Sequence, residues 1–187
     1  PLIMFDMIVA LYKKGAIQPE VISMKDGPLR ENYEAEGIPV QTLRFHRTFV
    51  SLAEYKASLE DWMKKANLKV HQLVYANTID AYFAIDAANM KGIPSIWNIY
   101  ESLPPNRLLP NLLNSVRKRA YECFQWPHRV IFGTDSTQKL YAPLESRNNF
   151  VAIHNSLNSK RFPSLDKEDK TNAKASISID ASDLVIL

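Results

Sequence analysis

The fold is indicated most clearly by residues 72–99, which read QLVYANTIDAYFAIDAANMKGIPSIWNI. Two short apolar runs, at 72–76 and 95–99, have the length and the β-branched and aromatic content of strands. Between them, residues 80–91 show helical periodicity, and Gly92 supplies the glycine that commonly follows the last turn of a helix. A strand, a helix and a second strand in this order predict a βαβ unit, in which the two strands run parallel.

The same alternation of short apolar runs and helical stretches extends in both directions along the chain. It predicts an α/β fold with a Rossmann-like parallel sheet and helices on both faces. Further strands are expected at residues 20–24, 38–43, 129–132 and 149–153. Further helices are expected at residues 1–11, 28–36, 52–66, 109–124, 136–141 and 171–179. Ser51 and Thr78 each precede an expected helix and are the predicted N-cap residues.

The composition is that of an ordinary globular domain. Of the 187 residues, 46% are hydrophobic and 23% are charged, and the formal net charge is +3. So small a net charge gives no support to nucleic-acid binding. No apolar run approaches the roughly 20 residues that a membrane-spanning helix needs. The single cysteine, Cys123, cannot form an internal disulfide, which fits a reducing compartment, so we expect a cytoplasmic protein.

The expected domain organisation follows the changes in composition along the chain. Residues 1–154 are expected to form one Rossmann-like domain, and the polar, proline-containing residues 155–169 an interdomain linker. Residues 170–187 are expected to begin a truncated second domain, because 183–187 read as a buried strand. The almost wholly apolar opening helix leads us to expect a preceding strand near the centre of the sheet. Without that strand, the sheet should contain an open slot.

Ligands of open parallel sheets bind beyond the carboxyl ends of the strands, so the residues that follow each predicted strand are the candidates for a site. These residues are polar: Asp26-Gly27, Asn77-Thr78, Tyr100-Glu101-Ser102, Gly133-Thr134-Asp135-Ser136 and His154-Asn155. A structural explanation stays open for each of them, because turns and helix caps also favour Asn, Asp, Ser and Thr.

Glu101 differs from the other candidates because glutamate is uncommon in turns. One interpretation is a cleft carboxylate that accepts hydrogen bonds from sugar hydroxyls or acts as a base. The alternative is a structural partner for Arg107 or for the N-terminus of a neighbouring helix. The sequence contains no glycine-rich phosphate loop, and its histidines and cysteine are not at metal-ligand spacings, so no metal is expected.

Several short segments together resemble the group 1, or GT4-type, glycosyltransferases, whose GT-B fold consists of two Rossmann-like domains that face each other across a cleft. These segments are residues 1–5, 26–29, 36–40, 92–102, 129–134, 153–157 and 184–187. Residues 92–102 resemble the family's "G-I-P…H-E-S" segment, and residues 153–157 its hinge motif. The chain departs from the family pattern at Tyr100, where many members carry a histidine, and at Ser156 and Asn158 in the hinge.

The resemblance implies a retaining, metal-independent transferase with a nucleoside-diphosphate sugar as donor and no tightly bound cofactor. The donor would bind mostly to a second domain outside this chain, which would itself hold the acceptor side. The catalytic candidates are Glu101 and Tyr100, and the substrate-binding candidates are Asn77, Thr78, Ser102, Thr134, His154 and Asn155. The expected partners are a sugar or lipid-linked sugar acceptor and the C-terminal domain of the same parent chain.

Two functions of different classes therefore remain open. The first is a transferase of cell-surface polysaccharide biosynthesis, for which peripheral membrane association is a further expectation. Arg117, Lys118 and Arg119, with Lys91, could face membrane phosphates or an anionic acceptor, although a solvated helix face would also explain them. The second is a non-catalytic Rossmann-like binding or interaction module, which Tyr100 favours.

Overall fold

The computed structural model describes residues 2–154, 167–180 and 182–183. The chain divides into two compact units, Pro1–His154 and Asn155–Leu187. In the second unit the structure describes one helix, α8 (Lys167–Ser176), which begins within the predicted linker, ahead of the helix expected at 171–179. The last four residues of the strand predicted at 183–187 lie outside the described residues, as does most of the linker. Of the helices in the described residues, none is both long and apolar enough to cross a membrane.

Parallel strands form the centre of the first unit, as the sequence predicts. β1 (Val21–Ser23) pairs with β2 (Val40–Thr42) in a two-stranded sheet. A four-stranded sheet contains β3 (Val74–Asn77), β4 (Ser95–Ile99), β5 (Arg129–Phe132) and β6 (Phe150–Ala152) in that spatial order. Because every pairing is parallel, the carboxyl ends of β3 to β6 lie at one edge. The α/β, Rossmann-like fold class is confirmed.

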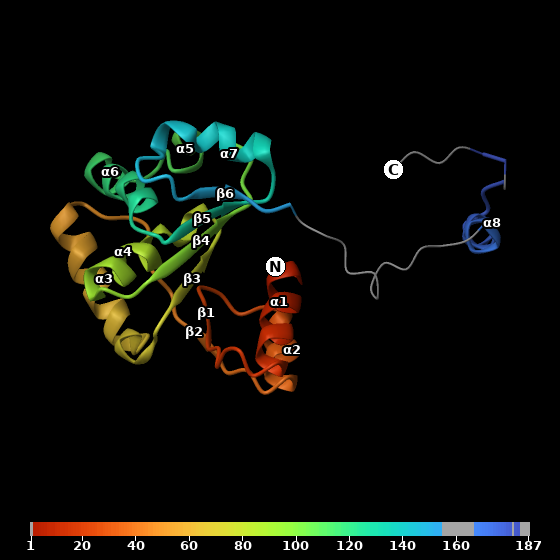
Figure 1. Cartoon of the computed structure of the whole chain (residues 1–187), viewed down its shortest axis with the longest axis horizontal. Helices are drawn as coiled ribbons and strands as arrows, with labels where there is room; N and C mark the ends of the chain where they lie inside the picture. Colours follow the sequence, from red (N-terminus) through yellow and green to blue (C-terminus); the bar gives the residue numbers. More distant parts are fainter. Residues whose placement is uncertain (1, 155–166, 181, 184–187) are drawn as a thin grey trace. The chain divides into compact units, whose positions relative to one another are not determined.

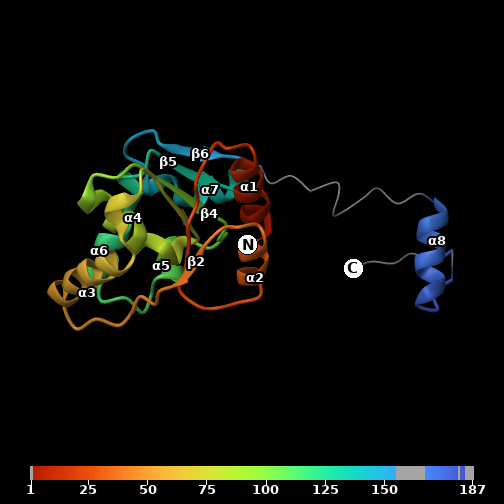
Figure 2. The same cartoon turned by 90° about the horizontal axis from the view of Figure 1, so that it is seen from below.

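The helices of the first unit form two groups (Figures 1 and 2). α1 (Leu2–Lys13) and α2 (Leu29–Ala35) lie beside β1 and β2. α3 (Leu52–Lys65), α4 (Tyr82–Lys91) and α6 (Asn114–Glu122) contact one another and cover β3 and β4. The remaining elements are short: α5 (Pro105–Leu108), α7 (Asp135–Tyr141), and the 3-10 turns η1 (Leu68–Val70), η2 (Ile79–Ala81), η3 (Cys123–Gln125) and η4 (Ala142–Leu144).

Of the predicted helix starts, the structure confirms one and contradicts two. The Ser51 hydroxyl accepts a hydrogen bond from the Glu54 amide at 3.1 Å, so the predicted N-cap of α3 is confirmed. The predicted N-cap at Thr78 is wrong, because its side chain makes no capping bond and its φ is 74°. The long helix expected over 109–124 is also wrong, since α6 begins only at Asn114. Pro110 explains the late start, because proline inside a helix lacks the N–H that the helix needs.

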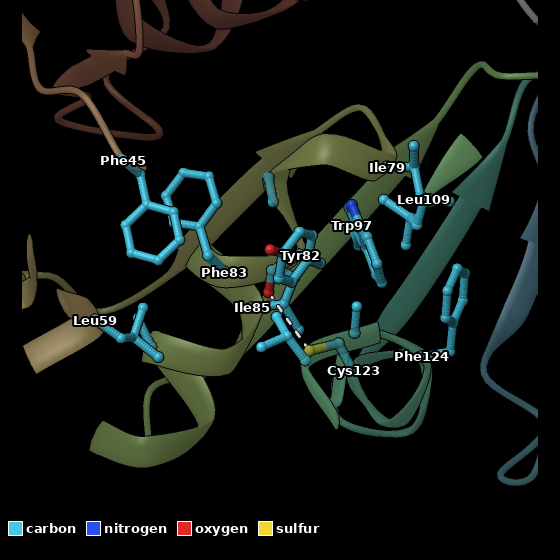
Figure 3. Close-up of a cluster of buried hydrophobic side chains, with 14 of the residues drawn as sticks. Phe45, Leu59, Ile79, Tyr82, Phe83, Ile85, Trp97, Leu109, Cys123 and Phe124 are labelled. Atoms are coloured by element: carbon cyan, nitrogen blue, oxygen red, sulfur yellow. Dashed lines mark hydrogen bonds between the residues drawn. The ribbon is translucent and has the colours of Figure 1, made fainter. Parts of the chain in front are cut away.

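Aromatic side chains dominate the core between the four-stranded sheet and its helices (Figure 3). The rings of Trp97 and Phe124 lie 4.5 Å apart between centroids, and both side chains are fully buried. Cys123 is also buried, and its thiol donates to the carbonyl oxygens of Tyr82 and Arg119. Trp97 therefore belongs to the core, and its indole is not available to a ligand.

A buried carboxylate connects the three large helices. Asp86 on α4 is 1% exposed. It accepts a hydrogen bond from the Tyr55 hydroxyl of α3 at 2.8 Å, and from Nε and Nη2 of Arg119 on α6 at 3.1 and 2.8 Å. The Arg119 guanidinium also lies 4.3 Å above the Trp126 ring. This network fixes the spacing of α3, α4 and α6, because each member satisfies a polar group that packing has removed from water.

Replacing Asp86 by alanine should lower the free energy of unfolding by about 3 to 5 kcal/mol, because Arg119 and Tyr55 lose their buried partner. Urea denaturation measures the change. Asp61→Ala is the matched control: the Asp61 ion pair with Lys65 is 59 to 60% exposed, and its loss should change stability by less than about 0.5 kcal/mol. Equal effects of the two substitutions would show that the Asp86 network does not hold the helices together.

Tyrosines removed from water make the folded domain less stable at alkaline pH. Burial, with a smaller contribution from Tyr100, raises the pKa of Tyr75 to about 12. An unfolded tyrosine loses its proton near pH 10. Between pH 10 and 12 the unfolded chain therefore releases a proton that the folded chain keeps, and stability must fall as the pH rises.

The Tyr75→Phe variant should lose stability less steeply over this pH range than the unsubstituted chain does. The difference in slope should approach about 1.4 kcal/mol per pH unit, the contribution of one titrating group. Urea denaturation at half-unit steps from pH 9 to pH 11.5, a range set by the pKa of about 10 for free tyrosine, measures both slopes. Identical slopes would mean that the Tyr75 phenol titrates normally in the folded protein.

Candidate functional site

The carboxyl edge of β3 to β6 brings polar residues from four strands into one row. Asn77 ends β3, Tyr100 follows β4, Thr134 follows β5, and His154 follows β6. The adjacent strands pair in order, with Asn77 opposite Asn98 and Ile99 opposite Phe132. The sheet topology therefore assembles residues that are far apart in the sequence, and the contacts below run along this row.

Glu101 holds the β3 end of the row in place. Its carboxylate accepts hydrogen bonds from the backbone amides of Ile79 and Tyr100, both at 3.1 Å. Its carbonyl oxygen accepts from the Tyr141 hydroxyl at 3.2 Å. Ile79 is the first residue of η2, so the side chain occupies the N-terminus of a neighbouring helical turn, one of the structural positions that the sequence leaves open. The carboxylate is partly buried, and both of its oxygens have a partner.

Thr78 adopts a strained backbone conformation beside Glu101. Its φ of 74° and ψ of 156° lie in a region that a β-branched residue rarely enters, at a cost of order 1 to 3 kcal/mol. Three contacts enforce the conformation. The indole Nε1 of Trp97 donates to the Thr78 carbonyl at 2.8 Å, the Thr78 amide donates to the carbonyl of Asn98 at 2.8 Å, and Glu101 holds the next amide. Strain of this kind is concentrated at functional sites.

Two side-chain amides continue the row from β3 to β4. The Nδ2 of Asn98 donates to the Oδ1 of Asn77 at 3.3 Å. Asn98 is 3% exposed, whereas Asn77 is only partly buried and lies at the edge. Among the described residues, the Asn77 amide nitrogen has no hydrogen-bond partner, whereas its oxygen already has a donor.

Hydroxyl groups connect β4 to β5. The Ser102 hydroxyl lies 3.1 Å from that of Thr137, and the Thr137 hydroxyl lies 2.9 Å from that of Thr134. The Thr134 hydroxyl also accepts from the Thr137 amide at 3.1 Å and so caps α7. Ser102 and Thr134 thus lie together, and Thr134 has a structural role whether or not it also contacts a ligand.

An exposed pair ends the row. The Nε2 of His154 lies 3.1 Å from a carboxylate oxygen of Asp135, and both side chains are about two-thirds exposed. Because water competes for both groups, the pair contributes little to stability and is free to exchange its partner for a ligand. Asn155, the last of the predicted site residues, lies outside the described residues.

Sequence reasoning names Asp135 within the polar run that follows the strand ending at Phe132, but does not place it among the predicted substrate-binding residues, and it does not name Asn98 as a candidate at all. Asn98 carries no such signal, because it lies inside a predicted strand. Within the described residues, no group of three or more His, Cys, Asp and Glu side chains is placed to hold a metal ion.

A cavity of about 650 Å³ reaches one end of this row. Asn77 and Thr78 line it, but Tyr100, Glu101 and His154 do not. Those three residues lie on an edge open to solvent, and Tyr100 is partly buried there. The row consists of amide, hydroxyl, imidazole and carboxylate groups, which suit the many hydroxyls of a sugar.

Replacing Glu101 by glutamine should release one of the two backbone amides that it holds, because an amide side chain has one acceptor oxygen. We expect a loss of about 1 to 2 kcal/mol in stability and at least about ten-fold faster hydrogen exchange at the Ile79 amide. Glu60→Gln, at an exposed position of α3, is the matched control and should leave both quantities unchanged. Unchanged exchange at Ile79 in the Glu101 variant would show that this carboxylate does not hold the turn.

Comparison with known proteins supports the fold. No protein-family model matches the chain, and none of the curated proteins matches it. A solved structure of Anabaena HepE in complex with UDP and glucose is similar, with a TM-score of 0.66 and 17% sequence identity over 94% of this chain and 46% of that one. HepE in complex with UDP-glucose gives a TM-score of 0.64 and 16% identity over 91% and 45%. The chain thus spans less than half of HepE, and the likeness shows a Rossmann-like domain of the GT-B type.

Proposed function

We propose that this chain is the acceptor-side domain of a glycosyltransferase that uses a nucleoside-diphosphate sugar as donor. The observation that carries the proposal is the row of polar groups along the carboxyl edge of β3 to β6. That row forms on a domain similar to part of HepE, which has been solved with UDP and glucose. The donor would bind mainly to a second domain, because the present sequence has no glycine-rich phosphate loop.

The division of roles along the row follows from the contacts of each residue. Glu101, Ser102 and Thr134 have partners inside the domain, so in this proposal they position the edge. The Asn77 amide nitrogen and the Tyr100 hydroxyl have no hydrogen-bond partner among the described residues, and the pair of His154 with Asp135 is exposed, so these groups would contact the acceptor. We further propose the GT4-type, retaining reaction that the resemblance implies, with Tyr100 in the position of the family's histidine.

A non-catalytic binding module is the second candidate. Two observations favour it: tyrosine replaces the family's histidine, and both oxygens of the Glu101 carboxylate are already engaged by backbone amides. In this arrangement the carboxylate holds two backbone amides of the domain, which is a structural role that needs no substrate. The two candidates differ in whether the parent protein releases UDP.

The test compares the parent polypeptide, extended past Leu187, with Pro1–Leu187 alone. With UDP-glucose as the donor probe, the parent should release UDP in the presence of acceptor, and the isolated chain should not. The isolated chain should also bind UDP weakly, so micromolar affinity in calorimetry, about −8 kcal/mol, would contradict the assignment of the donor site elsewhere. Acceptor binding by a parent that releases UDP from none of the common nucleotide sugars would support the non-catalytic module.

Two histidines at opposite edges of the sheet form a matched pair of variants. His154→Gln, at the carboxyl edge, should lower kcat/KM for the acceptor by about ten-fold, or 1.4 kcal/mol, with little change in melting temperature. His128→Gln, at the exposed amino end of β5, should change neither quantity. Equal kinetic effects of the two substitutions would show that the acceptor does not bind along the carboxyl edge.

A further inference from the structure

A second cavity, of about 320 Å³, lies between α3 and the segment that follows β2. The segment contributes Arg44 and His46 to its lining, and α3 contributes Ser58, Asp61, Trp62 and Lys65. A space of this size is within the range of small-molecule sites. None of these residues belongs to the row of polar groups at the carboxyl edge, so the cavity is a separate feature of the domain.

Phe45 fixes the segment that carries Arg44 and His46. Its side chain is buried and stacks on Phe83 with the ring centroids 4.3 Å apart, as Figure 3 shows. The same ring lies nearly perpendicular to that of Trp62, at 6.5 Å between centroids. Arg44 and His46 stand on either side of this anchor in the sequence and are exposed. Core packing therefore places a guanidinium and an imidazole beside α3.

The wall on α3 is one face of the helix. Its four residues lie at positions 58, 61, 62 and 65, a spacing that brings them to the same side. The Lys65 ammonium lies 2.6 Å from a carboxylate oxygen of Asp61. Gln41 of β2 donates through Nε2 to the Lys65 carbonyl at 3.2 Å, which ties the end of the helix to the strand. Packing and this hydrogen bond thus hold the two walls of the cavity together.

Hydrogen-bond donors outnumber acceptors in this cavity. Arg44 and Lys65 carry two permanent positive charges against the single carboxylate of Asp61, which Lys65 already engages. In the described part of the chain, the side chains of Arg44 and His46 have neither a hydrogen bond nor an ion pair. A ligand that matches this lining offers several acceptor oxygens and a negative charge.

The indole of Trp62 supplies a second, independent indication. Its side chain is 6% exposed, and its Nε1 is buried without a hydrogen-bond partner among the described residues. The indole of Trp97, by contrast, donates to the Thr78 carbonyl at 2.8 Å. Buried N–H groups nearly always have an acceptor, and an exception calls for a group that the protein itself does not supply. An oxygen of a ligand in the cavity would give the Trp62 indole its partner.

We propose that the cavity binds a phosphate monoester, with Arg44, Lys65 and the Trp62 indole as donors to its oxygens. The planar guanidinium matches two phosphate oxygens at once, and the ammonium adds a point charge. Lys65 would exchange the Asp61 carboxylate for the phosphate at little cost, because this ion pair is exposed. The site is independent of the proposed function, since it shares no residue with the row at the carboxyl edge.

Titration of the 187-residue chain with glycerol 3-phosphate tests the site, with sodium chloride at the same ionic strength as the reference. The indole N–H resonance of Trp62 should move saturably in proton–nitrogen correlation spectra. The indole resonance of Trp97, which already has a partner, should not move. Inorganic phosphate should compete with glycerol 3-phosphate for the same site.

Single substitutions separate a built site from a general surface charge. Arg44→Gln and Lys65→Gln should each weaken binding by at least about five-fold, since each removes a charged donor. Asp61→Asn should strengthen binding by about two-fold, because it removes the opposing charge. Lys64→Gln is the matched control. It removes the same charge from the neighbouring position of α3, which is exposed and does not line the cavity, and it should leave the affinity unchanged.

Lipid vesicles distinguish the two sources of such a phosphate. Phosphatidylcholine vesicles with and without about one-fifth phosphatidic acid are added as competitors of glycerol 3-phosphate. Competition by the acidic vesicles alone would identify a lipid headgroup as the ligand, and the absence of competition a soluble phosphorylated molecule.

Three results would overturn the proposal. The first is the absence of a saturable Trp62 shift with glycerol 3-phosphate. The second is an equal loss of affinity in Lys64→Gln and Lys65→Gln, which would show a general effect of surface charge. The third is a Trp62 shift that Arg44→Gln leaves unchanged, which would place the anion in the larger cavity that Trp62 also lines.

Discussion

The parallel pairing of β3 with β4 is the constraint on which the rest of the domain depends. It fixes Asn77 opposite Asn98, brings the end of β3 within reach of Glu101, and lets Trp97 donate to the carbonyl of Thr78. A slip of one residue would move Trp97 from the core to the other face of the sheet. The strained turn at Thr78, the buried core and the polar edge are therefore three results of a single register.

The sequence predicts the elements that depend on local pattern. The strands at 95–99 and 129–132 are found at those residues, and the capping box at Ser51 forms as expected, because a few neighbouring residues decide each of these features. Where tertiary contacts decide, prediction fails. Threonine is a residue type that helix N-caps favour, which is why Thr78 is predicted to be one. Trp97 and Glu101, about twenty residues further along the chain, force it into another conformation.

The candidate site shows the same division. Parallel topology is enough to predict which residues lie at the carboxyl edge of the sheet: Asn77, Tyr100, Ser102, Thr134 and His154. It is not enough to predict their partners. That Glu101 holds two backbone amides, and that His154 faces Asp135, depends on turn geometry that no local pattern records. Sequence reasoning leaves the role of Glu101 open between ligand and structure, and the contacts give it a structural role without assigning a catalytic one.

The buried thiol of Cys123 has a practical consequence for work on this domain. Burial raises the pKa of Cys123 well above its usual range, and the side chain is fully enclosed among the helices that cover the sheet. Alkylating reagents act on an accessible thiolate, which this residue does not provide. A cysteine introduced at an exposed position would therefore be modified selectively without removal of the native one. The folded domain can therefore carry a single fluorophore or spin label at a chosen position of the sheet edge, and a second label placed on another domain would report the distance between the two.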